Sequence, residues 1–495
     1  MTSEAGFSQP PLDDELVERL LQIPESDEVE FKRVGDNVRK LQTIGALANT
    51  RGGFLILGIE DPDKATGHDR VYGIQENPTS VDELKRLIGH RITPPLTGPD
   101  FIAPTFTEVG CTNRDGTIGS IILVRVEKSV GVHSMVDGGT YVRLLRTNRQ
   151  ISATEITELS LRRGTQSWVS ALADVPFDLI ETSYWREYAR ARRLTRPIDE
   201  ALRHLGLARA EGHGELRPTR AAVLLFAEDP AGLLDAKCSI RLFQYRGDRV
   251  EHTPDTNLLR PARTVSGPVI AQIRDATTAT LDALATGVQM GPLGFEVVQS
   301  YPVRVLKEAI TNAVIHRDYR VQADIHVRVF ANRVEIESPG LLPSNVTVAN
   351  IESAGSRPRN RALADHLREF PDPPNLDAGE GVRMMFQTML EAELYPPLYL
   401  TEPDWSREAV VVLCFNEARP DTWTQVEHYL TSHSDIGNAE IRQLLRTDDP
   451  VRASRLLKRW VDLGLLIVAD PEAAKQNRRY RRPGVPMAPD LFARG

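Results

Sequence analysis

The chain has 495 residues, 41% hydrophobic and 26% charged, a composition ordinary for soluble globular proteins and a length that allows about three or four domains. Its formal net charge of −8 excludes an overall positive field, so any contact with nucleic acid must use a local basic patch. The three cysteines form no CxxC pair, residues 1–11 have no apolar core, and the longest apolar runs have only strand length. These features predict a cytoplasmic protein with reduced cysteines and no membrane contact.

The first 164 residues mix helical and strand patterns around a glycine-rich turn. Apolar periodicity predicts helices over 13–22, 38–49 and 81–91 and strands over 54–59, 101–108 and 120–126. Asn49 and Thr50 end the second helix, Gly52 and Gly53 form the turn, and Asp61 follows the strand.

This segment resembles the Schlafen-type AlbA-like domain, whose bacterial members carry ES…EFK and then A-x-x-N-T-x-G-G-x-L-x-x-G-x-x-D. The resemblance implies an α/β DNA-binding module over residues 1–164. It also implies an alternative, because animal Schlafen proteins that cleave RNA carry acidic residues at the positions of Glu25, Glu30 and Asp61.

Three carboxylates at one edge of a sheet can hold Mg²⁺ or Mn²⁺ for phosphodiester cleavage. The two glutamates can equally pair with Lys32, Arg33 or Arg143, while Asp61 ends its strand in a turn. The same three cations, Lys32, Arg33 and Arg143, are candidates for nucleic-acid contact without cleavage.

Residues 165–300 form a connecting region in which the sequence indicates no chemistry. Its apolar patterns predict helices over 183–194, 198–205 and 263–284 and strands over 221–226 and 239–245.

Residues 305–319 (VLKEAITNAVIHRDY) predict a helix with one apolar face and one polar stripe. Glu308, Asn312 and His316 stand four residues apart and therefore share a helix face. On a bound nucleotide, the carboxylate can accept a proton from an attacking water, and the amide oxygen can ligate Mg²⁺. The alternative is a solvated stripe on an amphipathic helix.

The run E-A-I-T-N-A-V-I-H-R-D-Y resembles the first nucleotide-binding motif of the GHKL ATPases, in the branch found in predicted bacterial transcriptional regulators. The resemblance implies ATP and Mg²⁺ as cofactors. It also implies that Glu308 is the water-activating base of an ATPase, that Asn312 is the Mg²⁺ ligand, and that His316, Arg317 and Asp318 lie beside the phosphates.

Two strands are predicted over 325–340, and they end in Ser338-Pro339-Gly340, where the branch has Asn-Pro-Gly. By the same resemblance, Ser338 and Gly340 contribute to nucleotide binding. Ser338, or Glu337 one place earlier, stands where the wider superfamily has an Asp that hydrogen-bonds the adenine amino group.

Gly379 and Gly381 resemble the Gly-x-Gly that opens the lid helix, predicted here over 382–390. Glycines at a helix N-terminus let backbone N–H groups approach phosphates. The resemblance further implies that region 165–300 packs against a GHKL-type α/β sandwich over 301–420, which a strand over 409–415 completes.

Residues 421–495 have the pattern of a winged helix-turn-helix. Helices are predicted over 423–429, 438–446 and 451–463, with Val451 and Trp460 facing the core, and a hairpin is predicted over 465–482. Residues 451–482 carry nine basic and three acidic side chains, so their net charge is 9 − 3 = +6. The candidates for phosphate contact are Arg452, Arg455, Arg459, Arg479 and Arg481. The alternative use of such a domain is protein docking.

The sequence therefore predicts a multidomain α+β protein. The leading hypothesis is an ATP-binding, DNA-binding protein that acts as a nucleotide-responsive transcriptional regulator, with DNA and nucleotide as partners and a homodimer left open. The alternative is a metal-dependent Schlafen-type nuclease for RNA or DNA, with a role in defence, that the GHKL-type domain controls. A third hypothesis keeps ATP binding and uses both ends for protein docking.

Overall fold

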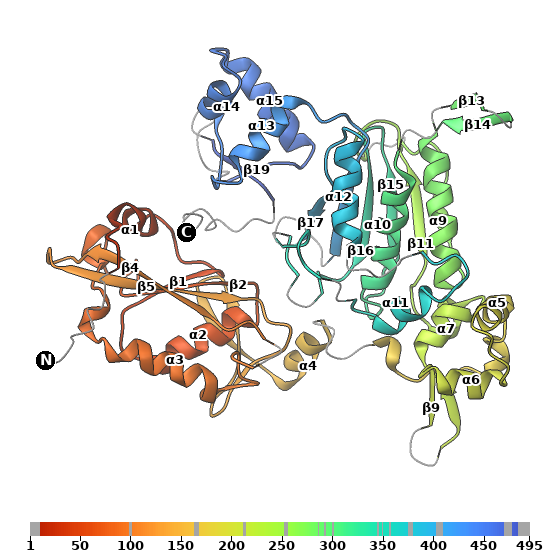
Figure 1. The fold of residues 1–495 in the computed structure, drawn as a ribbon, viewed down its shortest axis with the longest axis horizontal. Helices are drawn as coiled ribbons and strands as arrows, with labels where there is room; N and C mark the ends of the chain where they lie inside the picture. The colour runs from red at the N-terminus through yellow and green to blue at the C-terminus, as the bar shows by residue number, and fades with distance from the viewer. Residues whose placement is uncertain are drawn as a thin grey trace, which may run out of the picture. The chain divides into compact units, whose positions relative to one another are not determined.

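A computed structural model describes residues 10–98, 101–162, 168–210, 214–251, 256–285, 287–291, 294–298, 301–343, 346–348, 350–355, 358–374, 380–401, 409–469 and 478–483. The protein is a multidomain α+β chain, as predicted, and it divides into an N-terminal unit within 1–165 and a second unit over 166–485 (Figure 1). Among the described helices, none is both long and apolar enough to cross a membrane.

The N-terminal unit contains two four-stranded sheets. Its helices are α1 (Asp14–Leu21), α2 (Asn37–Ala48), α3 (Thr79–Arg91) and α4 (Ala153–Arg162). Its strands are β1 (Val29–Lys32), β2 (Gly52–Leu57), β3 (Ile92–Thr93), β4 (Thr105–Thr112), β5 (Ile118–Glu127), β6 (Ser134–Met135), β7 (Gly139–Leu144) and β8 (Thr147–Ile151).

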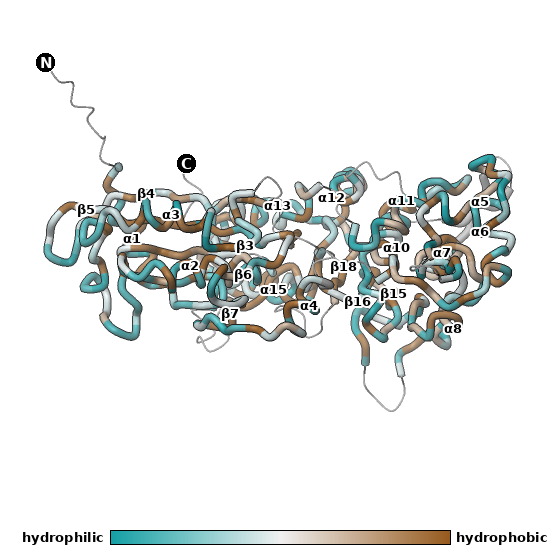
Figure 2. The backbone as a smooth tube through the Cα atoms, turned by 90° about the horizontal axis from the view of Figure 1, so that it is seen from below, coloured by the Kyte–Doolittle hydropathy of each residue, from teal (hydrophilic) through white to brown (hydrophobic). Residues whose placement is uncertain are grey.

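The first sheet has the order β1-β2-β5-β4, with β1 parallel to β2, and the second is the antiparallel sheet β3-β6-β7-β8. Alternate residues of β2 enter two cores, because successive side chains of a strand point to opposite faces. Ile56 packs with α1, whereas Leu55 and Leu57 pack with α2 and α3. The turn between β4 and β5 is hydrophilic, teal in Figure 2.

The predicted helices of this unit are confirmed to within two residues at each end, and the strand predicted over 101–108 lies later, at β4. The shift has a tertiary cause. β5 pairs with β4 from Thr105 to Thr112, and Asp14 of α1 accepts a hydrogen bond from the Thr112 N–H at 2.7 Å. These contacts extend the strand beyond its apolar run.

The second unit is built around a six-stranded sheet. Its helices are α5 (Ser183–Ala191), α6 (Ile198–His204), α7 (Arg220–Phe226), α8 (Pro230–Leu234), α9 (Val269–Leu284), α10 (Val303–His316), α11 (Arg361–Leu367), α12 (Gly381–Glu391), α13 (Asp421–Tyr429), α14 (Asn438–Leu444) and α15 (Pro450–Asp462). Its strands are β9 (Ala208–Ala210), β10 (Leu216–Pro218), β11 (Ile240–Gln244), β12 (Arg263–Val265), β13 (Gly287–Gly291), β14 (Gly294–Val298), β15 (Ile325–Val329), β16 (Arg333–Pro339), β17 (Leu398–Leu400), β18 (Ala409–Phe415), β19 (Ile467–Val468) and β20 (Tyr480–Arg481).

The six-stranded sheet has the order β12-β11-β15-β16-β18-β17, with α9, α10 and α12 over one face (Figure 1). One buried apolar cluster runs from Val169 to Cys414 and includes the inner faces of α7, α9 and α10. The predicted boundary at residue 300 therefore does not separate two cores, because β11 and β12 complete the sheet that β15, β16 and β18 begin.

Two predictions for the connecting region are wrong. Residues 221–226 are helical, in α7, which the Thr219 side chain caps through the Ala222 N–H, and all six are fully buried. A helix buried on every side has no apolar periodicity that would distinguish it from a buried strand. The helix predicted over 263–284 is the strand β12 followed by α9, and the chain reverses between them at Gly267, whose φ is +103°.

The C-terminal segment, described over 421–469 and 478–483, contains α13, α14, α15 and the antiparallel pair β19–β20, and Ile436 bridges to Tyr480. This is the order of elements that the sequence predicts. Trp460 is buried as expected, but Val451 is 55% exposed, since the Asp449 cap places it in the first turn of α15, away from the core.

Candidate functional site

A cavity of about 560 Å³ lies between α10, β16 and α12, within the roughly 300–1,000 Å³ that is usual for small-molecule sites. The apolar side chains on its lining include Ile336, Ile351, Met384, Tyr399, Val410 and Val412. The polar side chains on the lining are Arg304, Lys307, Glu308, Asn312, His316, Ser338, Glu352 and Glu380. A partly apolar ligand that also carries charged groups matches this mixed lining.

Glu308 and Asn312 both line the cavity, so their stripe does not face bulk solvent. The core side of α10 is buried as predicted, through Leu306, Ala309, Ile310, Ala313 and Val314. The Asn312 amide donates to the Glu308 carboxylate at 3.0 Å from Nδ2 to Oε1. Since the NH₂ group is turned towards Glu308, the Asn312 carbonyl oxygen remains available to a ligand. A carbonyl oxygen beside a carboxylate is a donor set that suits Mg²⁺.

Gly381, the first residue of α12, approaches the Glu308 carboxylate closely. A Cβ atom at this position would lie 1.8 Å from Glu308 Oε1, so a larger residue would displace the carboxylate or the helix. The start of α12 also lines the cavity, and the free N–H groups of a helix N-terminus favour anions. Gly379, predicted to share this role, lies outside the described residues.

Ser338 lines the cavity at the end of β16, and its hydroxyl donates to the Ala313 carbonyl at 2.9 Å. The donated proton leaves the oxygen as an acceptor. Glu337 lies on the opposite face of the strand, where it pairs with Arg328 at 2.6 Å, so Ser338 is the one of the two alternatives that reaches the cavity. Gly340 also lines the cavity, and a Cβ there would lie 2.7 Å from Asp318 Cβ.

The His316-Arg317-Asp318 run divides between two roles. His316 lines the cavity, whereas Arg317 and Asp318 are buried beside it and are not part of the lining. Arg317 donates to the carbonyls of Lys237 and Ala323, and burial lowers the pKa of its guanidinium. The prediction that Arg317 and Asp318 lie beside the phosphates is therefore not met by this geometry.

Arg359 and Asn360 hold the end of α10. The Asn360 amide donates to the carbonyls of Ile315 and Arg317 at 2.8 and 2.9 Å, and Arg359 donates to the carbonyl of His316 at 3.0 Å. These bonds satisfy carbonyls that a helix C-terminus leaves without intrahelical partners. The preceding residues 356–357 lie outside the described part of the chain.

Two cations on the lining were not identified from the sequence. Arg304 precedes Glu308 by one turn of α10. Lys307 is the residue directly before Glu308, and its Nζ lies 3.5 Å from the Asp372 carboxylate. The four-residue spacing of Glu308 and Asn312, extended one turn towards the N-terminus, identifies Arg304. Positive side chains near a helix N-terminus give phosphate groups charged partners.

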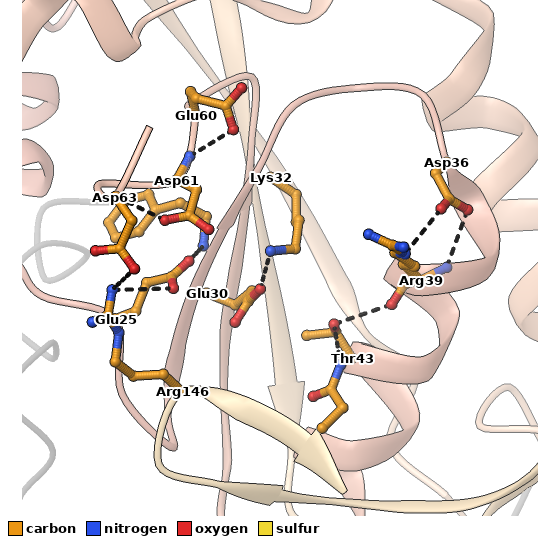
Figure 3. A network of polar contacts seen from close by, with 12 residues as sticks. Glu25, Glu30, Lys32, Asp36, Arg39, Thr43, Glu60, Asp61, Asp63 and Arg146 are labelled. Atoms are coloured by element: carbon orange, nitrogen blue, oxygen red, sulfur yellow. Dashed lines mark hydrogen bonds and ion pairs between the residues drawn. The ribbon is translucent and has the colours of Figure 1, made fainter. Parts of the chain in front are cut away.

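In the N-terminal unit, Glu25, Glu30 and Asp61 lie near one another but are paired within the protein (Figure 3). Glu30 forms ion pairs with Lys32 and, at 2.5 Å, with Arg143. Asp61 accepts a hydrogen bond from the Asp63 N–H at 2.9 Å, and so closes a turn. Within the described ranges, no group of three His, Cys, Asp or Glu residues is arranged to hold a metal ion.

Glu25 is buried and has a raised pKa. Its Oε1 accepts a hydrogen bond from the Phe31 N–H at 3.1 Å, and Oε2 lies 3.9 Å from Arg146. Burial raises the pKa of Glu25, and the negative charges of Glu30 and Asp61 raise it further. The side chain therefore holds its proton more tightly than an exposed glutamate does.

The residues of this unit that were predicted to contact nucleic acid differ in their exposure to solvent. Arg143 is wrong as a surface contact, because its side chain is only 1% exposed between Glu30 and the Ser26 carbonyl. Arg33 pairs with Glu76 and stacks on the Tyr72 ring at 3.8 Å, and Lys32 is partly exposed beside Glu30. Of the three, Lys32 and Arg33 remain accessible.

The five arginines predicted at the C-terminal end also differ. Arg452 and Arg455 are exposed on α15. Arg459 pairs with Glu417 at 2.9 Å, and Arg479 pairs with Asp435 and Glu440 at 2.6 and 2.7 Å. Arg481 is half-buried and donates to the Arg482 carbonyl. Arg452, Arg455 and Arg459 are all exposed on the predicted recognition helix, and of these three Arg459 is paired with a carboxylate, that of Glu417.

Comparison with known proteins supports a two-part description of the chain. Residues 25–152 match the family model described as "Schlafen, AlbA_2", and residues 322–410 match the one described as "Putative ATP-dependent DNA helicase recG C-terminal". The protein thus carries a Schlafen AlbA_2 domain followed by an ATPase-like domain. The second match begins after α10, so it does not include Glu308 or Asn312.

Among solved structures, the DIP2311 protein from Corynebacterium diphtheriae is similar at 18% identity, with 94% of this chain and 96% of that chain covered and a TM-score of 0.39. Among curated proteins, none matches the sequence.

Gly381→Ala is expected to weaken binding of ATP with Mg²⁺ about 10- to 100-fold without unfolding the protein, because the added Cβ displaces the start of α12, and loss of a hydrogen bond to a charged group costs about 1.5–3 kcal/mol. The matched control is Gly355→Ala, which changes the lining of the same cavity where a Cβ meets nothing within 4 Å. Titration with a fluorescent ATP analogue measures the affinities. Equal affinities for the two variants would contradict the importance of the close approach to Glu308.

Glu25→Gln is expected to stabilise the N-terminal unit at neutral pH. Because folding raises the pKa of Glu25, the unit loses stability as the pH rises from the unfolded pKa to the folded one. Glutamine keeps an oxygen for the Phe31 N–H and does not titrate. All five tryptophans lie beyond residue 165, so hydrogen exchange of β1 and β2 is the suitable measurement, with the exposed Glu158→Gln as control. A stability that falls equally with pH in both variants would contradict the assignment.

Proposed function

We propose that the protein binds ATP and Mg²⁺ in the cavity beside α10 and that it is a DNA-binding, nucleotide-responsive transcriptional regulator. The observation that carries the nucleotide part is the Glu308–Asn312 pair, which projects into a 560 Å³ cavity at the N-terminus of α12. The ATPase-like family match of the adjoining residues 322–410 supports the same assignment.

Four polar side chains on the lining, those of Arg304, Lys307, Glu308 and Asn312, have stated tasks in this proposal. Asn312 offers its carbonyl oxygen to Mg²⁺, which neutralises phosphate charge when bound. Arg304 and Lys307 attract the phosphates, and the N–H groups at Gly381 receive them. Glu308 accepts the proton of a water that attacks the terminal phosphate, while the bond from that phosphate to ADP breaks and ADP leaves with inorganic phosphate as the second product. The hydrogen bond from Asn312 keeps the Glu308 carboxylate in position. The chain is then an ATPase.

Ser338 sets the recognition of the base. Its hydroxyl donates to Ala313 and can accept a hydrogen bond from the adenine amino group, but as a neutral acceptor. A neutral acceptor binds an amino group less strongly than a carboxylate does. We therefore infer that this protein prefers ATP over GTP less strongly than a protein with Asp at this position.

The DNA-binding part rests on both ends of the chain. The Schlafen AlbA_2 match over 25–152 supports a nucleic-acid role for the N-terminal unit. The C-terminal segment has three helices, a bridge at Ile436 and a β19–β20 pair, in the order of a winged helix, with Arg452 and Arg455 exposed on the third helix. In that fold the third helix enters the major groove.

The nuclease alternative lacks a specific observation in its favour. Glu30 is neutralised by Lys32 and Arg143, and the three carboxylates are not arranged as a metal site in the described part of the unit. The regulator proposal is the better supported of the two.

Asn312→Ala is expected to lower the affinity for ATP–Mg²⁺ about 10- to 100-fold, because it removes a ligand oxygen and the hydrogen bond that positions Glu308. Glu308→Gln is expected to retain binding and lower the hydrolysis rate by about 10²- to 10⁴-fold. Calorimetry measures binding and phosphate release measures turnover. Gln387→Ala on the exposed side of α12 is the control. Full hydrolysis by Glu308→Gln would exclude this carboxylate as the base.

The regulatory part is tested by titrating labelled duplex DNA with the full chain, with and without ATP–Mg²⁺, at one salt concentration. The expected result is a change in DNA affinity of about 5- to 150-fold, the usual range of coupling between two sites. At an ATP–Mg²⁺ concentration near the Kd of the parent protein, Asn312→Ala should greatly reduce the change while DNA binding without nucleotide stays the same. An affinity that ATP leaves unaltered would remove the coupling from the proposal.

A further inference from the structure

Strand β18 is buried on both faces, and each face serves a different part of the second unit. Val410 and Val412 line the cavity beside α10. Their neighbours Val411, Leu413 and Phe415 point the other way and belong to the buried cluster of the C-terminal segment. One strand therefore separates the candidate nucleotide site from the candidate DNA-binding segment.

The C-terminal segment is docked on this outer face through an apolar core. Trp423 and Trp460 pack at 5.2 Å between ring centroids, and Tyr395 and Phe415 from the sheet side pack in the same cluster. The segment thus has no separate apolar core among its described residues, because it shares this one with β17 and β18.

At the polar rim of this contact, the basic flank of α15 lies beside acidic groups from other parts of the second unit. Arg455, Lys458 and Arg459 line a cleft of about 290 Å³ together with Asp248 and Glu417. Arg459 pairs with Glu417 at 2.9 Å, and both side chains are partly exposed. The pair is intramolecular and is not needed to fill the apolar core.

The basic stripe of α15 consists of Arg452, Arg455 and Arg459, which stand three and four residues apart and therefore lie on one helix face. The two ends of this stripe differ in their contacts. Arg452 at the N-terminal end is exposed, whereas Arg459 at the other end is held by Glu417. A DNA backbone that followed the whole stripe would bring phosphates against Glu417 and Asp248, and like charges at this range repel.

We propose that the docked arrangement is autoinhibitory: Glu417 pairs with Arg459 on the basic flank of α15, Asp248 lines the same cleft, and DNA binding by that flank requires this contact to open. The inference rests on the proposed DNA-binding function and adds the contact that controls it. Because β18 contacts both sites, it is the element through which occupation of the cavity biases the docked and open states. The two states need only differ in their affinity for the ligand for this bias to exist.

The test uses Glu417→Gln and the double variant Glu417→Gln/Asp248→Asn in the full chain. Glu369→Gln is the matched control, because it removes the same charge from another partly exposed ion pair, with Arg192 at 3.3 Å. Affinity for one labelled duplex is measured by anisotropy at a fixed low salt concentration. We expect about fivefold tighter binding for the single variant and about tenfold for the double variant, each relative to the control, as partly exposed pairs allow.

Hydrogen exchange of the α15 amides in the absence of DNA gives a second readout. Faster exchange in Glu417→Gln than in Glu369→Gln is expected, because the docked state is weakened. If Glu417→Gln and Glu369→Gln bind DNA equally, autoinhibition is excluded while the DNA-binding function stands. If neither the parent protein nor any variant binds DNA, the proposed function fails and this inference fails with it.

Discussion

The burial of α10 against the six-stranded sheet is the constraint on which the candidate site depends. Leu306, Ile310 and Val314 must enter the core, and at 3.6 residues per turn this fixes the direction of the opposite stripe. Glu308 and Asn312 therefore face the space beneath α12 without help from a loop. A pair held on one rigid helix keeps its separation when a ligand binds, which is what a phosphate site with a positioned base requires.

The residues around that helix show that a motif can serve a site without touching its ligand. His316 reaches the cavity, but Arg317 and Asp318 are used to anchor neighbouring backbone, and Asn360 satisfies two carbonyls at the end of α10. A frayed helix end would let the His316 turn move. The His316-Arg317-Asp318 run thus contributes His316 to the polar stripe of α10 and also holds the end of that helix in place.

Most helices, and the pairing of residues on α10, could be predicted from the spacing of apolar residues, because in an amphipathic helix this spacing shows which side faces the core. Residues 221–226 could not, since a fully buried helix has no polar side to mark its period. Arg304 could have been identified by extending the four-residue spacing of Glu308 and Asn312. The partners of Arg143 and Arg459 could not be identified in this way, because Glu30 and Glu417 come from segments distant in sequence and contact these arginines only in the folded chain.

The same limitation affects charge counts. The value of +6 for residues 451–482 treats every side chain as free, but Arg459, Arg479 and Arg482 are paired with carboxylates from outside that stretch, including Glu417 and Glu427. The potential that a DNA backbone meets is set by which of these pairs are closed. A domain whose cations are partly neutralised by its own chain can change its affinity for DNA by moving a few ångströms, with no change in sequence or net charge.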